Sequence, residues 1–278
     1  MAGNGVTMRT MRPKRRAASL VLALGLLGCA TARNYPDPAG PRFAGQFAGL
    51  PAERPLRVVS FNIKYGRNVT GAAALLREDV RLKDADVIAL QEMDETGVEC
   101  LARTLRLNYV YYPGAVHPAD HRNFGNAILS PWPIEDDVKI PLPHLGRFRK
   151  MQRIAVAATV RIHGDLPVRV FSVHFETPAG AGPSAKRDQA RTIVAQAKGY
   201  PRVLVAGDFN GRGFIESVFP PAGFQWLTRD VGRTISRFSW DHLLTRGLRL
   251  AGCASVGSAP NALKVSDHIP VWAELTPE

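Results

Sequence analysis

Short apolar runs alternate with polar turns along most of the chain, and three longer stretches carry apolar residues at helical spacing. The helical spacing predicts amphipathic helices at 71–84, 96–107 and 185–198, with Leu76 and Val80 on one face of the first. The apolar runs predict buried strands at 56–63, 85–92, 108–114, 125–130, 154–164, 167–176, 202–210, 239–245 and 269–275.

The order of these elements indicates the fold class. The strands at 154–164 and 167–176 are separated by a turn around Gly164 and Asp165, which predicts a hairpin. Repeated hairpins with intervening helices favour an α/β fold of stacked sheets flanked by helices over a simple Rossmann alternation. The sequence contains neither a GxGxxG motif nor a Walker loop.

The first 28 residues resemble an export signal. A basic segment, MRPKRR, precedes the apolar segment AASLVLALGLLG, which at roughly a dozen residues is too short for a permanent membrane span. A small residue followed by Cys29 resembles the bacterial lipobox and predicts cleavage before Cys29 and lipidation of its sulfur; an ordinary signal peptide with an incidental cysteine is the alternative. Because Ala30 rather than Asp follows, we expect a lipid anchor in the bacterial cell envelope, at the outer membrane facing the periplasm.

The next segment, 29–55, is rich in Pro, Gly and Ala and has no period. This composition predicts a lipidated N-terminus followed by a flexible tether. One folded domain is then expected over residues 56–278, a length that suits a single sizeable core.

The charge favours an anionic partner. The net charge of +12 falls to +7 without the five basic residues of 1–28, and a basic surface attracts nucleic acid, phosphorylated metabolites or anionic lipid. An Arg-rich composition without a functional meaning is the alternative. Cys100 and Cys253 lie in apolar surroundings without metal-ligand spacing, so we expect buried free thiols, with a disulfide as the alternative.

Several predicted strands end on a polar side chain. One such residue is typical of a turn, but the set supplies carboxylates, amides and imidazoles that suggest one site. Oxygen ligands with open water positions suit Mg²⁺ or Mn²⁺, and histidine without cysteine argues against structural zinc. The residues are Asn62, Glu92, His174, Asp208, Asn210, Asp241, Asp267 and His268.

The segments that carry these residues resemble the endonuclease/exonuclease/phosphatase superfamily. The resemblance covers about residues 56–275 and rests on SFNIKYG, DVIALQEMD, GNAILS, FSVHFET, VLVAGDFNG, SWDHLLTRGL and VSDHIPVWAEL, in this order. It implies a four-layer sandwich, with two mixed β-sheets packed face to face and helices outside. It also implies hydrolysis of phosphate esters by in-line attack of water, assisted by a divalent metal.

The resemblance implies a role for each matching residue. Glu92 matches the main metal carboxylate, Asn62 the amide beside it, and Asp267 a ligand of the metal or of its water. Asp208 matches the residue that orients and deprotonates the attacking water, and Asn210 matches its neighbour, which holds water and phosphate. The phosphate-facing histidine corresponds to His268, its orienting carboxylate to Asp241, and the second phosphate-facing histidine to His174.

Structural explanations compete with these roles. Asn62 and Asn210 could be turn residues, and His174 could be a core histidine. Asn126 is a weak candidate for substrate contact, and Tyr111 and Tyr112 are candidates for the tyrosine of apurinic endonucleases. The histidines expected on the surface are His117, His121, His144 and His163, and the expected solvated charges are Lys186, Arg187 and Arg191.

The function expected from sequence is therefore a metal-dependent phosphodiesterase or nuclease that acts as a monomer. Its substrate would be nucleic acid, a lipid headgroup or a phosphorylated metabolite. A phosphomonoesterase of soluble phosphorylated sugars is the second hypothesis, and a non-catalytic envelope lipoprotein with the same fold is the third, because fold alone does not establish activity.

Overall fold

The computed structural model describes Met1 and residues 31–48, 55–164 and 166–278. The predicted export signal and Cys29 lie outside the described residues. Within the described part, no helix has the length and apolar character needed to cross a membrane.

The first sheet contains nine strands among the described residues, in the order β1-β5-β6-β4-β3-β15-β13, with β2 on β5 and β14 on β15. The strands are β1 (Arg33–Asn34), β2 (Phe43–Gly45), β3 (Leu56–Asn62), β4 (Val87–Met93), β5 (Asn108–Val116), β6 (Asn123–Ser130), β13 (Leu248–Leu250), β14 (Val256–Ser258) and β15 (Val271–Pro277). The pair β3–β4 is parallel and β4–β6 is antiparallel, so the sheet is mixed.

The second sheet contains six described strands in the order β11-β12-β10-β9-β8-β7. These are β7 (Ile134–Pro141), β8 (Ile154–Ile162), β9 (Leu166–His174), β10 (Val203–Asp208), β11 (Gln225–Trp226) and β12 (Asp241–Arg246). The predicted hairpin is the antiparallel pair β8–β9, whereas β9 and β10 pair in parallel.

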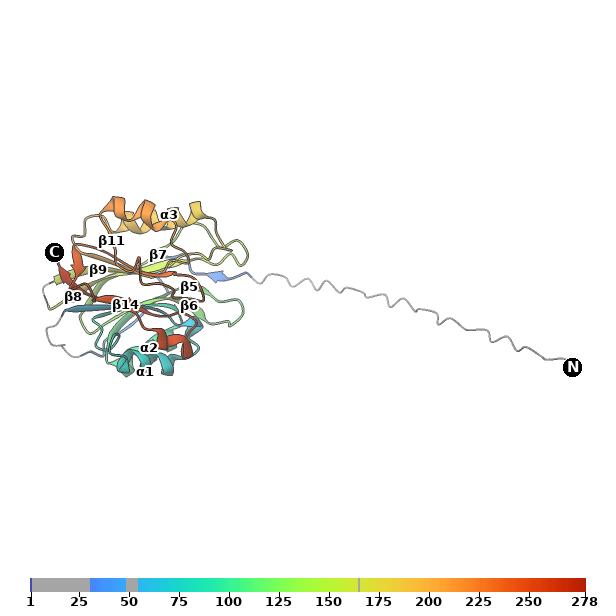
Figure 1. The fold of residues 1–278 in the computed structure, drawn as a ribbon, viewed down its shortest axis with the longest axis horizontal. Helices are drawn as coiled ribbons and strands as arrows, with labels where there is room; N and C mark the ends of the chain where they lie inside the picture. Colours follow the sequence, from blue (N-terminus) through green and yellow to red (C-terminus); the bar gives the residue numbers. More distant parts are fainter. Residues whose placement is uncertain (2–30, 49–54, 165) are drawn as a thin grey trace.

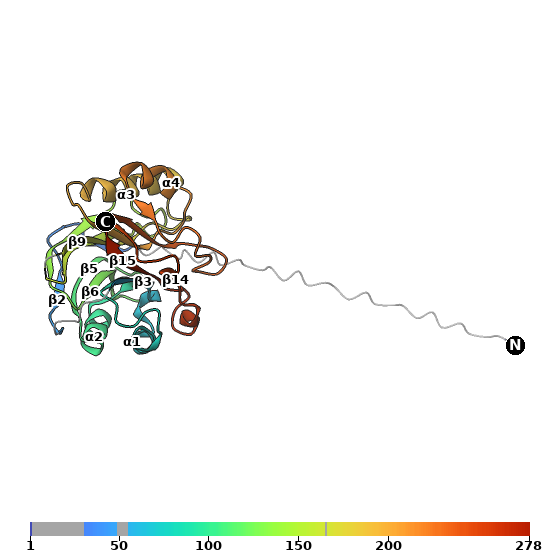
Figure 2. The ribbon, with the colours of Figure 1, turned by 60° about the vertical axis from the view of Figure 1, so that its left-hand side comes forward.

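The two sheets pack face to face with helices outside, which confirms the predicted four-layer α/β sandwich. Helices α1 (Val69–Glu78) and α2 (Glu95–Leu105) cover the first sheet, and α3 (Pro183–Gln196) and α4 (Ile215–Val218) cover the second (Figure 1). The view in Figure 2 shows the same two helical layers on opposite sides. Short helices of other pitch occur at Lys64–Gly66, Pro220–Ala222 and Pro260–Lys264.

Alternation along the strands places apolar side chains both between the two sheets and under the helices on each side. Val58 lies in the cluster between the sheets together with Val170 and Leu204, whereas the adjacent Val59 packs toward α1 and α2. Because successive side chains of a strand point to opposite faces, strands buried on both faces read as continuous apolar runs. This is why the sequence pattern located most of the strands.

The expected tether is wrong for residues 31–48, which belong to the fold. β1 and β2 both pair with β5. Arg42 forms an ion pair with Asp137 through Nε and Oδ2 at 2.6 Å, and the buried Lys139 donates to the carbonyl oxygens of Tyr35 and Gly40. Strands of two or three residues are too short to show a period, so composition alone was misleading here.

Two smaller expectations also differ from the structure. The first helix ends at Glu78, because the backbone of Asp79 is extended and its carboxylate accepts from the backbone and side chain of Arg81. Val80, expected on the buried face, is 68% exposed. Cys100 and Cys253 are free and exposed rather than buried.

Candidate active site

Strand register brings the polar strand ends together at one edge of the sandwich. In the second sheet, Asp208 at the end of β10 lies opposite His174 of β9 on one side and Asp241 of β12 on the other. In the first sheet, the parallel pairing of β3 and β4 places Asn62 opposite Gln91, immediately before Glu92. The two sheets meet face to face, so both groups of side chains enter the same space.

Asp208 lies at the centre of this group and is 2% exposed. Its Oδ2 accepts from Nδ2 of Asn62 at 3.1 Å, and its Oδ1 accepts from the backbone N–H of Asn210 at 2.8 Å. Nε2 of His174 lies 3.4 Å from Asp208 Oδ2, and Nε2 of His268 lies 3.8 Å from the same oxygen. Burial raises the pKa of Asp208 to about 7, a value suited to accepting a proton near neutral pH.

His268 is held by Asp241, which is 1% exposed. Nδ1 of the ring lies 2.9 Å from Oδ2 of Asp241, so Nε2 faces Asp208. Burial disfavours the charged ring, but the carboxylates of Asp241 and Asp208 outweigh it and raise the pKa of His268 to about 10. His268 is therefore an imidazolium at neutral pH, with one N–H aimed into the site.

Glu92 enters the site from an irregular point of β4. The register between β4 and β6 shifts between Leu90 and Met93, and Glu92 has a φ of 59°. A bulge of this kind redirects one side chain, and a left-handed backbone at a non-glycine residue is typical of functional positions. The carboxylate of Glu92 accepts from Asn62 Nδ2 at 3.2 Å, and burial raises its pKa.

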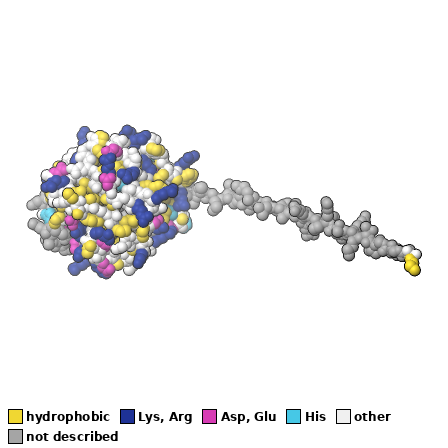
Figure 3. Space-filling model, viewed as in Figure 1, with side chains coloured by type: hydrophobic (Ala, Val, Ile, Leu, Met, Phe, Trp, Pro, Cys, Tyr) yellow, Lys and Arg dark blue, Asp and Glu magenta, His cyan; other side chains and the backbone are white. Residues whose placement is uncertain are grey.

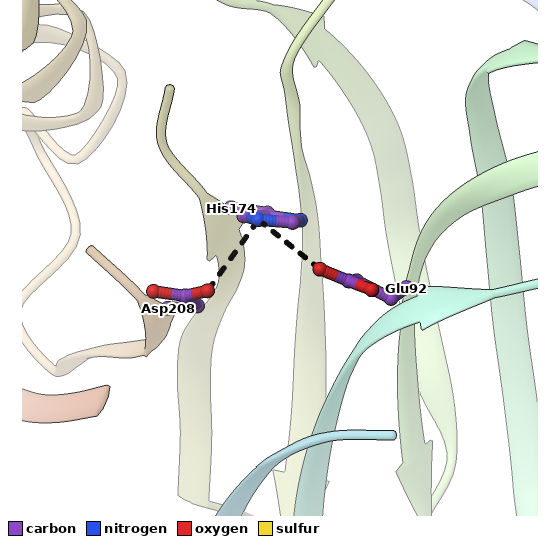
Figure 4. Close-up of side chains that lie close together, drawn as sticks. All are labelled: Glu92, His174 and Asp208. Atoms are coloured by element: carbon purple, nitrogen blue, oxygen red, sulfur yellow. Dashed lines mark ion pairs between the residues drawn. The ribbon is translucent and has the colours of Figure 1, made fainter. Parts of the chain in front are cut away.

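The donor set fits a hard divalent cation. Ligand atoms of Glu92, His174 and Asp208 all lie within 4.8 Å of one another, as do those of Asp208, Asp241 and His268. Figure 4 shows His174 between the carboxylates of Glu92 and Asp208. The carboxylates of Glu92 and Asp208, both with raised pKa values, accept hydrogen bonds from the same amide of Asn62. A cation between their oxygens would compensate both negative charges.

Asp267 lies apart from this group. Its side chain is 43% exposed, and its Oδ2 lies 2.9 Å from Nζ of Lys64. The neighbouring Ser266 has a positioning role, because its hydroxyl donates to the carbonyl oxygen of Asn62 and accepts from the N–H of His268. The structure thus brings seven of the eight predicted residues into contact range and leaves Asp267 in an ion pair.

Asn210 and Lys186 form the side of the site near α3. Asn210 has a φ of 49°, and its Nδ2 donates to the carbonyl oxygen of Phe175 at 2.9 Å. Lys186 is buried and its Nζ donates to the carbonyl oxygen of Asn210, which corrects the expectation of a solvated charge. Burial lowers the pKa of Lys186 to about 8.

Arg153 is a site residue that the sequence pattern did not reveal. It is 8% exposed; its Nη1 lies 3.0 Å from Nε2 of His174, and its Nε lies 3.4 Å from Oε2 of Glu176. Burial and the charges of Arg153 and His268 hold the pKa of His174 well below its ordinary value, so this ring is neutral. The feature of the sequence that could have indicated Arg153 is its place directly before the apolar run of β8.

A cavity of about 250 Å³ opens beside Glu92. Tyr65, His117, Phe124 and Arg153 are among its lining residues. His117 is 5% exposed, so its assignment to the surface was wrong. Its ring lies against Tyr65, with centroids 4.7 Å apart.

A second cavity, of about 580 Å³, lies beside Asn210. Lys186, Phe238 and Trp240 contribute to its lining. The rings of Phe238 and Trp240 are stacked with centroids 4.9 Å apart, and Phe238 is 41% exposed. This cavity therefore presents an aromatic surface next to a buried cation.

Three further candidates have structural roles. Asn126 is buried, and its Nδ2 donates to the carbonyl oxygens of Ile154 and Ser172. The hydroxyl of Tyr111 donates to the carbonyl oxygen of Met93, and that of Tyr112 to Asp137. Tyr65, rather than either of these tyrosines, lines the cavity at Glu92.

Solved structures share this fold. An endonuclease/exonuclease/phosphatase from Beutenbergia cavernae is 19% identical with a TM-score of 0.64, covering 81% of this chain and 72% of the other. D. rerio TDP2 complexed with a single-strand DNA product is 18% identical with a TM-score of 0.64, covering 81% of this chain and 100% of the other. The mannosyl-6-phosphatase Bt3783 of Bacteroides thetaiotaomicron is 16% identical with a TM-score of 0.57, covering 80% of this chain and 99% of the other.

The sequence comparisons are consistent with this likeness. No curated protein matches this sequence. A sequence model of the Endonuclease/Exonuclease/phosphatase family matches residues 59–268. Members of this family hydrolyse phosphate esters. The chain belongs to the endonuclease/exonuclease/phosphatase family.

Proposed function

We propose that the protein is a divalent-metal-dependent phosphodiesterase, with Mg²⁺ or Mn²⁺ as the cation. The observation that carries the proposal is the position of Asp208, a buried carboxylate between a neutral and a charged imidazole. This arrangement places a proton acceptor, Asp208, within 3.8 Å of a positive charge, the ring of His268. A phosphoryl group that is attacked by water needs both.

The residues divide the chemistry in the following way. Asp208 accepts a proton from the attacking water, whose oxygen forms the new bond to phosphorus while the ester P–O bond breaks and its electrons leave with the ester oxygen. The imidazolium of His268 stabilises the negative charge on the phosphoryl oxygens, and Asp241 fixes the orientation of this ring.

Glu92 and an oxygen of Asp208 would hold the cation, and Asn62 would support them, because its Nδ2 donates to both carboxylates. When bound, a divalent cation supplies positive charge to the phosphoryl oxygens and the leaving oxygen. Glu92 contributes a carboxylate that is only 15% exposed, and the amide of Asn62 orients it. Neutral His174 lies opposite Glu92 and offers a hydrogen bond to a bound phosphate.

Two cavities that border different residues of the site support a diester over a monoester. One lies next to Glu92 and the other next to Asn210. A phosphodiester carries an organic group on each side of phosphorus, whereas a monoester needs room for only one. The aromatic and basic linings suit planar and anionic groups, and TDP2, a relative in fold, has been solved with a single-strand DNA product.

The test is hydrolysis of a substrate panel with Mg²⁺ and with EDTA. The panel contains bis-p-nitrophenyl phosphate, p-nitrophenyl phosphate, plasmid DNA, sphingomyelin and mannose 6-phosphate. We expect EDTA-sensitive cleavage of the diesters at higher kcat/KM than the monoesters. Preference for the monoesters would favour the phosphomonoesterase, and no cleavage of any compound would favour a binding protein.

We also propose that the protein is anchored in the cell envelope through a lipid on Cys29. The apolar segment before a small residue and Cys29 supports this proposal. Expression of Cys29→Ala in the full-length chain should move the protein from the membrane fraction to the soluble fraction. Unchanged partition, with no lipid on the unaltered chain by mass spectrometry, would contradict the anchor.

A further inference from the structure

The loop between β7 and β8 has the composition of a membrane-surface segment. Its residues 145–150, which we call the docking loop, read LGRFRK. Leu145 and Phe148 are 46% and 59% exposed and are among the few large apolar side chains on the surface of the described residues. Arg147, Arg149 and Lys150 alternate with them and are exposed as well.

The positive charges of the docking loop have no acidic partner in the part of the chain that the structure describes, although Nη1 of Arg149 lies 3.0 Å from Nε2 of His117. Among the described residues, no acidic side chain forms an ion pair with Arg147, Arg149 or Lys150. Basic residues interleaved with exposed apolar ones bind anionic lipid surfaces, because headgroups attract the charges and the interfacial region accepts the apolar side chains.

The N-terminal segment is fixed directly to this loop. Nδ2 of Asn34 donates to the carbonyl oxygen of Lys150 at 2.7 Å, and its Oδ1 accepts from the N–H of Gln152 at 2.8 Å. The N–H of Ala32 donates to the carbonyl oxygen of Arg149 at 2.9 Å. The chain therefore enters the fold alongside the docking loop.

Only three residue steps separate Cys29 from Ala32. A fully extended chain spans about 3.3–3.6 Å per residue, so these steps reach at most roughly 11 Å. Attachment of Cys29 to a membrane thus holds Ala32, and the docking loop that Ala32 contacts, within roughly 11 Å of the anchored residue. Figure 3 shows Lys and Arg side chains interspersed with hydrophobic ones on one face of the domain.

We propose that the docking loop binds an anionic lipid bilayer, with Leu145 and Phe148 entering the interfacial region and Arg147 and Lys150 contacting headgroups. This inference goes beyond hydrolysis, because it assigns an orientation to the molecule. Arg147, Phe148 and Arg149 also line the cavity beside Glu92. The mouth of that cavity therefore faces the headgroup layer, and the enzyme acts on phosphate esters presented at or near the membrane surface.

The test places a photo-crosslinking residue in the full chain. Phe148→p-benzoylphenylalanine keeps a large aromatic side chain, and Val80→p-benzoylphenylalanine is a matched control, because Val80 is also exposed but lies beyond α1 on the far helical layer. Both chains are reconstituted with vesicles of phosphatidylglycerol and phosphatidylcholine and irradiated. Lipid adducts at position 148 and none at position 80 are expected by mass spectrometry.

A second comparison tests the charges. Arg147→Gln with Lys150→Gln should reduce the adduct yield at position 148 by about fivefold for each basic residue removed. Lys198→Gln with Arg249→Gln removes two exposed charges elsewhere and should leave the yield unchanged. Vesicles of phosphatidylcholine alone should give the low yield with every variant.

Several outcomes would overturn the proposal. These are a full chain that does not sediment with vesicles, equal adducts at positions 148 and 80, or a stronger adduct at position 148 with an added single-stranded oligonucleotide than with lipid. Hydrolysis of soluble bis-p-nitrophenyl phosphate by the unaltered chain is measured in parallel. Active enzyme without lipid contact at position 148 thus rejects the docking loop alone, and inactive enzyme with such contact rejects the proposed function alone.

Discussion

The imidazole of His268 and the carboxylate of Asp241 join the two sheets of the sandwich through a contact of 2.9 Å. Asp241 begins β12 in the second sheet, whereas His268 precedes β15 in the first. The charged ring therefore keeps its place only while the two sheets are in register. Both the chemistry and its dependence on pH follow from this contact.

Replacing Asp208 should remove the proton acceptor without disturbing the fold. Asp208→Asn is nearly isosteric, but a neutral amide cannot take a proton from water, so kcat should fall at least ~10²-fold while KM changes little. Steady-state kinetics on the best diester checks this result. Asp230→Asn, at an exposed position, is the control and should behave as wild type; a folded Asp208→Asn enzyme with wild-type kcat would falsify the assignment.

Glu92 and Asp267 should differ in their effect on the cation. Glu92→Gln removes a largely enclosed carboxylate from the centre and should weaken Mg²⁺ binding by at least ~10-fold, because the loss of even a residue that only supports a ligand costs that much. Asp267→Asn should weaken Mg²⁺ binding less than Glu92→Gln does, because the carboxylate of Asp267 is exposed and pairs with Lys64. Calorimetric titration with Mg²⁺ measures both, and an equal or larger loss for Asp267→Asn would return Asp267 to the set of ligands.

His268 should make stability depend on pH in the metal-free protein. Its pKa is about 10 when folded against 6.5 when unfolded, so the folded state holds a proton that the unfolded state releases as pH rises. The stabilisation is complete below pH 6.5 and is lost as pH passes through about 10. Urea denaturation in EDTA at pH 7 and pH 10 should show a smaller drop for His268→Asn than for wild type, and equal drops would contradict the raised pKa.

Arg153 should contribute to stability through its buried ion pair with Glu176. Arg153→Met leaves that carboxylate, whose side chain is 5% exposed, without its cation, and breaking such a pair costs about 3–5 kcal/mol. Adding Glu176→Gln should recover part of the loss, because no charge then remains buried. Thermal and urea unfolding of both single variants and the double variant measure the coupling; strictly additive losses would show that the pair is not coupled.

Much of the fold could be predicted from the sequence because strands buried on both faces leave a strong local signal. Runs such as those ending at Asn62 and Asp208 also carry a polar residue directly after the apolar stretch, and this local feature located most of the site. The short strands β1 and β2 carry no such signal. Their place is decided by pairing with β5, which is distant in sequence.

The missed site residues depend on tertiary contacts. Arg153 and His117 are buried only because loops from different parts of the chain converge on the cavity at Glu92. Asp267 forms an ion pair with Lys64 instead of joining the site. The backbone of Lys64 has a φ of 34°, and the hydrophobic pattern of the sequence gives no sign of this conformation. Local pattern thus identifies residues at strand ends, whereas loop residues require the assembled sandwich.

The place of β15 in the first sheet has a consequence for biosynthesis. This strand, residues 271–277, lies inside the sheet between β3 and β13, and His268 comes just before it. A nascent chain that still lacks these residues has a gap in the middle of a sheet and no charged ring beside Asp208. A chain truncated before residue 268 is therefore expected to lack both a continuous first sheet and the charged ring, and with them the proposed hydrolytic activity.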